Sequence, residues 1–501
     1  MLARMLIRSS AMSFFLWGTM LHAMSYYVDS QTGNDANPGT SSSRPWQTLN
    51  KVNTSSFRPG DNILFRAGGV WEGQLAPRSP GSVGHPIVID KYGSGPLPKL
   101  NGDGKVDDVV YLHNVSEIEV RHLEVTNKAD TPALRRGVDI YLDNFGTAKH
   151  VVLADLFIHD VRGTNARKDN GGIIFRTMGE RVPSRFDGLL IERNIVWRVD
   201  RSAIVAESYH ARRTHWFPSL HVVIRDNYVE DIGGDGIVPW ATDRAIIEHN
   251  IARYCNRRAG SFNAGIWPWS ADNSIFQLNE AAFTQTTRDG EGFDSDYNSR
   301  NTLFQYNYSH DNAGGFMLIC TPVKRDSETN VGNTGTIIRY NVSRNDHNRI
   351  FNLSGADDVR VENNVVYVGS GDNVQILLVS MWNGWSKNAV FEANKFYIQG
   401  HAEYGHEVHR DEDGKYQVEP GWGGAQQIRF VGNNYFGPNA TAPEGDDGHI
   451  DPSKNAASWK EDEPQFDPSS ADHFDGFLQK HRKWMMAMLR QRLGTEIRLE
   501  E

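Results

Sequence analysis

The chain has 501 residues, a length that one large all-β unit or about three ordinary domains would account for. Its 39% hydrophobic residues, with 47 Gly and 20 Pro, exclude collagen-like, low-complexity and grossly disordered proteins. The formal net charge of -10 argues against a nucleic acid or an anionic membrane as partner, because their phosphates would be repelled.

The first 23 residues have the order of a secretory signal. Arg4 and Arg8 precede an apolar run over residues 11–21, after which the sequence becomes polar. This run is too short to span a bilayer comfortably, and no later segment has a transmembrane pattern. A start codon assigned upstream of a chain that begins near Met24 is the alternative. We predict a signal peptide over residues 1–23 and a secreted or periplasmic product with no membrane partner.

A short phrase, an apolar residue followed three residues later by Asn, recurs through the chain. The phrase ends at Asn194, Asn227, Asn250, Asn279, Asn307, Asn341, Asn364, Asn394 and Asn433, with a weaker first copy at Asp155. Spacings that begin at 23 residues indicate a solenoid, and the Ile, Val, Phe and Tyr of each phrase favour short strands. Stacked coils would place each Asn above the previous one, where amides satisfy buried turns. We therefore predict an asparagine ladder.

A second phrase, a small residue followed by an apolar strand, gives the register of one parallel sheet. Its inward column is Ile173, Ile204, Ile237, Ile266, Phe293 and Phe316. Alternation then predicts two outward columns, which are Ile174, Val205, Val238, Trp267, Asp294 and Met317, and Arg176, Glu207, Trp240, Trp269, Asp296 and Ile319. The longest insertions follow this strand, so loops should wall a groove on that sheet.

The pattern stops beyond residue 438. Residues 439–470 are polar with several Pro and indicate a linker or a wrapping segment, while residues 471–494 carry apolar residues at helical spacing. We predict a β-helix over residues 24–438, then a polar linker and an amphipathic helix within residues 439–501. Because a solenoid must cover its last coil, packing on the β-helix is favoured over binding a partner.

Carboxylates cluster on one strand of the predicted groove. Asp289, Glu291, Asp294 and Asp296 lie within eight residues, and Asp235 occupies the same turn column as Glu291 two coils earlier. Clustered carboxyl groups repel one another, so an acid and a base can coexist near neutral pH. A solvated acidic turn is the alternative interpretation.

Aromatic and charged residues flank this strand. Outward-facing tryptophans suit the apolar faces of sugar rings, although they are also typical of a hydrophobic cover beneath a loop. The predicted substrate-binding residues are Trp240, Trp267, Trp269, Arg176, Glu207, Arg288 and His310. The two cysteines, Cys255 and Cys320, are too few for a disulfide framework or a thiolate zinc site.

Three further motifs stand out, which are the opening Tyr26–Asp29 with Gly33–Asp35, then Pro59–Asp61, and the strand Arg288–Asp294 that leads into Phe304–Asn312. With these motifs the sequence resembles the secreted right-handed parallel β-helix enzymes that act on polysaccharides. The acidic strand looks like that of the glycoside hydrolases of the xylosidase and fucosidase type. It also looks like the calcium-binding strand of the family-nine pectate lyases. The resemblance implies an all-β, right-handed parallel β-helix with a C-terminal helical appendage.

Hydrolysis is favoured over elimination. A lyase needs a basic residue and a Ca²⁺ ion or another cation, but the coil after Asp294 contains no Lys or Arg in its strand, and Lys324 lies further out. Hydrolysis requires only two carboxyl groups across a glycosidic bond. We therefore predict an exported, monomeric glycoside hydrolase of polysaccharides or oligosaccharides with Asp294 essential and Glu291 the leading acid. Asp296 and Asp235 are further candidates.

Two alternatives stay open. The first is a Ca²⁺-dependent pectate or uronate lyase, in which Asp289, Glu291 and Asp294 would hold the ion, whereas a hydrolase needs no cofactor. The second is a glycan-binding β-helix without catalysis. A purely structural solenoid has no need to gather acids, tryptophans and long loops on one face.

Overall fold

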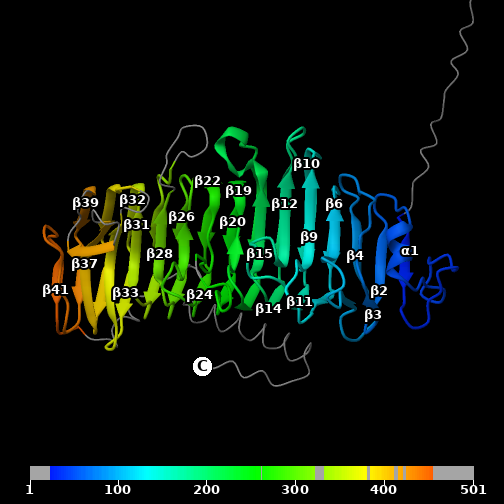
Figure 1. Cartoon of the computed structure of the whole chain (residues 1–501), viewed down its shortest axis with the longest axis horizontal. Helices are drawn as coiled ribbons and strands as arrows, with labels where there is room; N and C mark the ends of the chain where they lie inside the picture. The colour runs from blue at the N-terminus through cyan, green and yellow to red at the C-terminus, as the bar shows by residue number, and fades with distance from the viewer. Residues whose placement is uncertain are drawn as a thin grey trace, which may run out of the picture.

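The computed structural model describes residues 23–454 except residues 261, 322–331, 381–383, 411–415 and 421–424. The chain winds as a right-handed parallel β-helix, so the predicted fold class is confirmed (Figure 1). The predicted signal segment, apart from Ala23, and the predicted C-terminal helix lie outside the described residues. No helix of the described part is long and apolar enough to cross a bilayer.

Each coil contributes strands to three sheets, which we call the first, second and groove sheets. The first sheet contains β1 (Ser25–Val28), β2 (Asn62–Arg66), β4 (Ile87–Tyr92), β7 (Ile118–Arg121), β10 (Thr147–Ala154), β13 (Arg185–Glu192), β16 (Ser219–Arg225), β20 (Ile246–Glu248), β23 (Ile275–Gln277), β26 (Leu303–Gln305), β29 (Ile337–Arg339), β32 (Asp357–Glu362), β35 (Lys387–Glu392) and β39 (Gln426–Val431), with β19 (Trp240–Asp243) and β22 (Trp269–Asp272) beside them. The second sheet contains β3 (Val70–Glu72), β5 (Lys99–Asn101), β8 (Glu124–Asn127), β11 (Phe157–Val161), β14 (Ile195–Val199), β17 (Tyr228–Ile232), β21 (Ile251–Arg253), β24 (Glu280–Ala282), β27 (Tyr308–His310), β30 (Val342–Arg344), β33 (Val365–Val368), β36 (Lys395–Ile398), β40 (Asn434–Phe436) and β41 (His449–Asp451).

The groove sheet has two parts. They are β6 (Asp108–His113), β9 (Arg136–Asp143), β12 (Gly171–Met178), β15 (Ser202–Ser208) and β18 (Ile237–Val238), then β25 (Glu291–Ser295), β28 (Gly315–Cys320), β31 (Arg349–Ser354), β34 (Asn373–Ser380), β37 (His401–Arg410) and β38 (Tyr416–Pro420). Single bridges join Ile237 to Ile266 and Ile266 to Phe293, so the two parts are continuous in space. Helix α1 (Leu49–Thr54) and the short 3-10 turns η1 (Tyr209–Ala211) and η2 (Arg213–His215) complete the elements.

The asparagine ladder is confirmed. From Asn194 to Asn433, the side-chain amide of each Asn donates to the side-chain oxygen of the next at 2.9–3.0 Å. The weaker first copy was assigned one residue too early, because Asp155 lies beside Arg193 and it is Leu156 that donates its N–H to Asn194. Each ladder residue satisfies turn backbone that water cannot reach.

Apolar side chains fill the interior between the sheets. Stacked pairs on the first sheet include Phe276 with Phe304 and Phe391 with Phe430, whose ring centroids lie 4.6 and 4.5 Å apart. Burial of each such ring contributes about 1.5–3 kcal/mol relative to exposure. The inward-facing residues of each strand therefore pack against those of the neighbouring coils and stabilise the stack.

The predicted inward column of the groove sheet is confirmed except at its last coil. Ile173 pairs with Ile204, Ile204 with Ile237, and the bridges continue to Phe293. There the expected register is wrong by one residue, because Phe293 pairs with Met317 and Asp294 with Leu318. Gly315 lies opposite Glu291, so Met317 points inward and Leu318 and Cys320 face the groove.

Strand pairing continues beyond residue 438. Strand β41 extends the second sheet beside β40, although residues 439–470 were expected to be a linker. Residues 439–454 therefore add a further strand to the end of the solenoid.

Candidate active site

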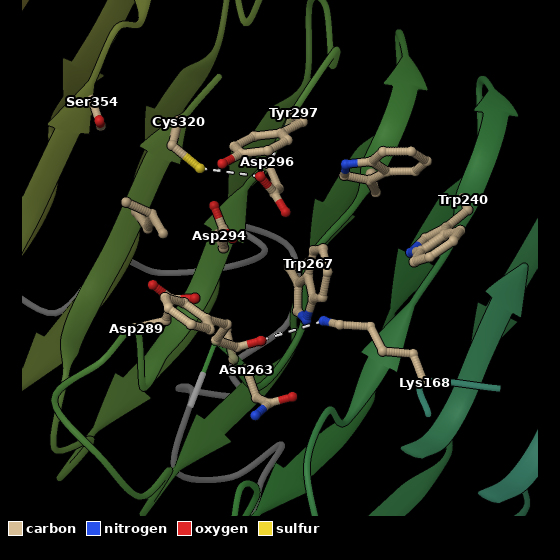
Figure 2. Close-up of a pocket in the computed structure, with 14 residues that line it drawn as sticks. Lys168, Trp240, Asn263, Trp267, Asp289, Asp294, Asp296, Tyr297, Cys320 and Ser354 are labelled. Carbon is tan, nitrogen blue, oxygen red and sulfur yellow. Dashed lines mark hydrogen bonds between the residues drawn. The ribbon is translucent and has the colours of Figure 1, made fainter. Parts of the chain in front are cut away.

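A cavity of about 490 Å³ opens on the outer face of the groove sheet, where its two parts meet (Figure 2). It is lined by Lys168, Trp240, Phe262, Asn263, Ala264, Trp267, Trp269, Asp289, Asp294, Asp296, Tyr297, Leu318, Cys320 and Ser354. These residues are spread between Lys168 and Ser354 over several coils, so only the winding of the solenoid brings them together.

Two features direct the acidic side chains of β25 and its preceding turn to the cavity, namely the alternation of side chains along the strand and the turn before it. Phe293 points into the core, so Asp294 and Asp296 point outward to the cavity. Before the strand, Asp289 and Gly290 both have positive φ values of 59° and 82°. This turn breaks the alternation, and it directs Asp289 to the cavity. Figure 2 shows Asp294 between Asp289 and Asp296 in this view.

The three cavity carboxyl groups differ in their ionisation. Burial, followed by the charges of Glu291 and Asp296, raises the pKa of Asp289 to about 8. Burial also raises the pKa of Asp296 to about 6, against hydrogen bonds from Cys320 and from the Tyr297 N–H. Asp294 is buried, and desolvation with the charges of its neighbours raises its pKa well above the usual range. Near neutral pH a carboxylate at Asp296 and a carboxylic acid at Asp289 can therefore coexist.

Asp294 and Cys320 form the floor of the cavity with Asp296. The thiol of Cys320 donates a hydrogen bond to Oδ1 of Asp296, and Oδ1 of Asp294 is buried without a hydrogen-bond partner. Ligand atoms of Asp294, Asp296 and Cys320 all lie within 4.8 Å of one another. An unpaired buried oxygen on a cavity floor is available to a hydroxyl of a bound molecule.

Lys168 enters the cavity from the loop before β12. Its ammonium lies 4.4 Å from the centre of the Trp267 ring and 3.1 Å from Oδ2 of Asp235, and it donates to the Phe262 carbonyl. The Trp267 indole N–H in turn donates to Oδ1 of Asp235 over 3.1 Å. Asp235 is thus a buried anchor behind the wall and does not line the cavity.

Trp240 and Trp269 form the wall opposite the acids. They are paired across neighbouring coils with ring centroids 4.7 Å apart and ring planes inclined by 49°. The indole nitrogen of Trp240 is buried without a hydrogen-bond partner and lies on the side of the ring that faces Trp267 (Figure 2). Together with Trp267 they pack on a small apolar cluster that includes Val238.

Glu291, expected as the leading acid, lies elsewhere. Its side chain is fully buried, does not line the cavity, and accepts a hydrogen bond of 2.9 Å from Nε of Arg349. It shares the inward parity of Phe293, so the alternation that directs Asp294 outward directs Glu291 away. The predicted column of Asp235 and Glu291 is present, with Ala264 between them, but neither carboxyl group reaches the cavity.

The remaining predicted binding residues lie outside the cavity lining. Arg176 pairs with Asp139 and stacks over Tyr141 at 4.1 Å, and Glu207 is its neighbour on β15. His310 is on the second sheet, where it contacts Glu280 and Asp311. Arg288 is exposed and contributes its carbonyl to the Phe262 N–H.

The sequence patterns missed several cavity residues, among them Lys168, Phe262, Asn263 and Tyr297. Lys168 and Phe262 are 94 residues apart in the chain and meet through two loops, for which no repeat gives a register. Cys320 was identified only as a cysteine, and the correct register of β28 would have placed it opposite Asp296. Tyr297 follows Asp296 directly and could have been found from that position.

The acids do not form the ligand set expected for Ca²⁺. Of the predicted ligands Asp289, Glu291 and Asp294, the second is turned away and paired with Arg349. In the described part of the chain, the group of potential ligands that does come together contains the Cys320 sulfur. Calcium prefers six to eight hard oxygen ligands, so the donor set does not fit it.

Known proteins similar to this chain include lacto-N-biosidases, whereas no family model matches it. The chain is 31% identical over 451 residues to a lacto-N-biosidase of Bifidobacterium longum subsp. longum, with 70% of this chain covered. It spans only 28% of the length of that relative. The crystal structure of the native GH136 lacto-N-biosidase from Eubacterium ramulus matches with a TM-score of 0.64 and 27% identity, covering 76% of this chain and 68% of that one. Its selenomethionine derivative matches with a TM-score of 0.62 and 25% identity, covering 81% and 68%.

These similarities support the broad class of β-helix carbohydrate-active enzymes that the motifs indicated. They do not support its xylosidase and fucosidase type.

Proposed function

We propose that this protein is a glycoside hydrolase that cleaves oligosaccharides ending in a neutral disaccharide of the lacto-N-biose type. The observation that carries the proposal is the set of three carboxyl groups with different ionisation in a cavity walled by tryptophans. The similarity to lacto-N-biosidases supports this substrate class over the polysaccharides considered from the sequence.

Asp289 is assigned as the general acid and Asp296 as the carboxylate. The acid must hold its proton near neutral pH, which fits the raised pKa of Asp289, about 8. The carboxylate must be ionised, which fits Asp296, whose pKa of about 6 lies below that of Asp289. Asp289 gives its proton to the glycosidic oxygen as the bond to the anomeric carbon breaks. Asp296 attacks that carbon or removes a proton from an attacking water.

Asp294 takes a binding role in this assignment. Its carboxyl group is buried between the other two, and it has an unpaired Oδ1 and a pKa that burial raises well above its usual range. A protonated carboxyl group can both donate to and accept from a sugar hydroxyl. Glu291 is not assigned a catalytic role, because its pairing with Arg349 keeps it out of the cavity.

Neutral sugars suit the cavity better than uronates do. Three carboxyl groups line it against one ammonium, and that ammonium pairs with Asp235. A substrate carboxylate would therefore meet the negative charge of Asp296 in a poorly solvated site. Trp240, Trp267 and Trp269 offer the apolar surface that pyranose rings prefer.

The lyase alternative gains a basic residue from Lys168 but lacks support for its use. The Lys168 nitrogen donates to the Phe262 carbonyl and lies against Asp235, so it is engaged as a cation rather than free as a base. The groups that would hold Ca²⁺ for such a lyase do not converge. A hydrolase of this assignment needs no cofactor.

Export and a monomeric state belong to the same proposal. The basic and apolar order of residues 1–23 supports a signal peptide, and the acidic surface charge supports a freely diffusing protein with an oligosaccharide as partner.

The test is hydrolysis of p-nitrophenyl lacto-N-bioside and of lacto-N-biose-terminated oligosaccharides by the purified protein. We expect new reducing ends and a fall in kcat of at least about a thousandfold in Asp296→Asn. Asp187→Asn, which changes a surface carboxylate beside His221, is the matched control and should retain activity. A parallel assay on a uronate polysaccharide such as pectate tests the lyase, which products with an unsaturated uronate, lost on chelation of Ca²⁺, would favour. Binding without turnover, equal in Asp296→Asn, would favour the glycan-binding protein.

A further inference from the structure

Phe262 at the rim of the cavity is an exposed aromatic residue in a constrained backbone. Its side chain is 63% exposed, whereas Trp267 beside it is 4% exposed. Its φ is 58°, in the left-handed region that bulky residues rarely adopt. A mostly exposed ring gains little free energy from burial in the folded protein, so burial alone does not explain its position.

The backbone of Phe262 is fixed on both sides while its ring is free. Its N–H donates to the carbonyl of Arg288 over 3.2 Å, and its carbonyl accepts from Nζ of Lys168 over 3.3 Å. The next residue, Asn263, is buried and accepts a hydrogen bond from Arg201. The rim is therefore preorganised, and no ordering of the backbone is needed to present the ring.

Phe283 shows what a structural phenylalanine with the same backbone does. Its φ is also 58°, but its ring stacks on Tyr254 at 4.8 Å and meets the edge of His310 at 5.2 Å. Its conformation is therefore stabilised by ring contacts within the coil stack. Phe262 has the same backbone geometry and leaves most of its ring to solvent at the mouth of a cavity.

The position of Phe262 indicates which part of a bound substrate its ring would contact. Asn263 is bridged to Asp289 across neighbouring coils, so Phe262 lies directly beside the proposed general acid. A general acid protonates the oxygen that departs with the leaving group, so it stands on the leaving-group side of the scissile bond. An aromatic ring next to it faces the sugar that departs.

We propose that Phe262 is a stacking platform for the pyranose unit on the leaving-group side of the cleaved bond. This inference rests on the proposed hydrolase function and on Asp289 as its acid. Lys168 is a positioning residue that holds the platform through the Phe262 carbonyl. The pyranose presents its apolar face to the ring, as sugar rings do on aromatic side chains.

The test compares two substrates that share the same donor sugar. In lacto-N-biosyl fluoride the leaving group is a single atom, whereas in a lacto-N-biose-terminated oligosaccharide it is a sugar. For Phe262→Ala we expect the ratio of kcat/KM on the oligosaccharide to kcat/KM on the fluoride to fall roughly three- to tenfold. The fall should arise in KM, and Phe262→Trp should restore the ratio.

Phe283→Ala is the matched control. It should lower Tm because its ring contacts are lost, without changing the ratio of the two substrates. Phe262→Ala should leave Tm close to that of the unmodified protein. An unchanged ratio in Phe262→Ala, or an equal loss on both substrates with a lowered Tm, would overturn the platform while leaving the hydrolase intact. Absence of turnover of either substrate by the unmodified protein would instead overturn the proposed function, and this inference with it.

Discussion

The thiol of Cys320 donates a hydrogen bond of 3.1 Å to Oδ1 of Asp296 across neighbouring coils of the groove sheet. Burial, followed by the charge of Asp296, raises the pKa of Cys320 well above its usual range, so the thiol keeps the proton that it donates. The bond stabilises the ionised form of Asp296 and opposes the effect of burial on its pKa.

We expect Cys320→Ala to move the acid side of the pH–activity profile to higher pH. Without the thiol donor the pKa of Asp296 rises above its value of about 6, so a higher pH is needed to ionise it. Cys320→Ser keeps a donor and should move the profile less. Cys255→Ala, which changes the other buried cysteine in the core, is the control. The dependence of kcat/KM on pH measures this effect, and an unmoved acid side in Cys320→Ala would contradict the role of Asp296.

The two assigned carboxyl groups predict a bell-shaped profile with its maximum near pH 7. Activity should rise as Asp296 ionises with a pKa of about 6 and fall as Asp289 loses its proton with a pKa of about 8. Asp289→Asn should lose the alkaline side. It should also cost about 10²–10⁴-fold on oligosaccharides but far less on a dinitrophenyl glycoside, whose leaving group needs no proton. Asp296→Asn should be inactive on both substrates. A similar loss on both substrates in Asp289→Asn would remove it as the acid.

The repeat made the fold and half of the site predictable. The register of the ladder residues can be predicted because each Asn ends the same phrase. Once that register is known, the inward columns of the core follow from it. Asp294 and Asp296 were placed correctly on the groove face, because strand alternation alone decides their direction. Trp240, Trp267 and Trp269 followed from the same columns.

The other site predictions are wrong at positions where the repeat of the coils is interrupted. Gly315-Phe316 has the same pattern as Gly292-Phe293, so the sequence predicts that these pairs lie side by side. In the structure Gly315 lies opposite Glu291, and the predicted column is therefore wrong by one residue. The turn at Asp289 reverses the direction that alternation would give, so Asp289 lines the cavity and Glu291 does not.

Loop residues were beyond any repeat. The Lys168–Phe262 contact joins two loops that vary in length from coil to coil, so neither residue had a register to be read from. Their placement depends on the tertiary contacts of Asp235, Trp267 and Asn263, which no spacing in the sequence records.

Lys168→Met should move both sides of the pH–activity profile to higher pH. The positive charge of Lys168 lowers the pKa of Asp289 and of Asp296, so its removal raises both. This pattern differs from Cys320→Ala, which should move the acid side alone. Lys168→Arg retains the charge and should keep the profile near its original position. Lys99→Met, which removes a lysine paired with Glu124 on the second sheet, is the control. An unmoved profile in Lys168→Met would show that Lys168 does not act on the carboxyl groups.

Asn279→Ala should be among the most damaging substitutions outside the cavity. Asn279 is fully buried, donates to the Ile247 carbonyl and to Asn307, and accepts from the backbone and side chain of Asn250. Its loss leaves buried donors and acceptors on both neighbouring coils unpaired. We expect the free energy of unfolding to fall by about 2–4 kcal/mol, measured by urea denaturation followed by circular dichroism.

An asparagine outside the ladder is the control for the general effect of replacing Asn by Ala. Asn388 also donates a side-chain hydrogen bond, of 2.8 Å to Asp357, but it is only half-buried, and its φ is 54°. Water replaces that partner when the amide is removed, and Ala is less favourable than Asn at this φ, so Asn388→Ala should lower the free energy of unfolding by only about 1 kcal/mol. Equal losses in the two variants would mean that the coils gain no special stability from the ladder. A large loss in the free energy of unfolding that is confined to Asn279→Ala would show that the asparagine ladder stabilises the solenoid.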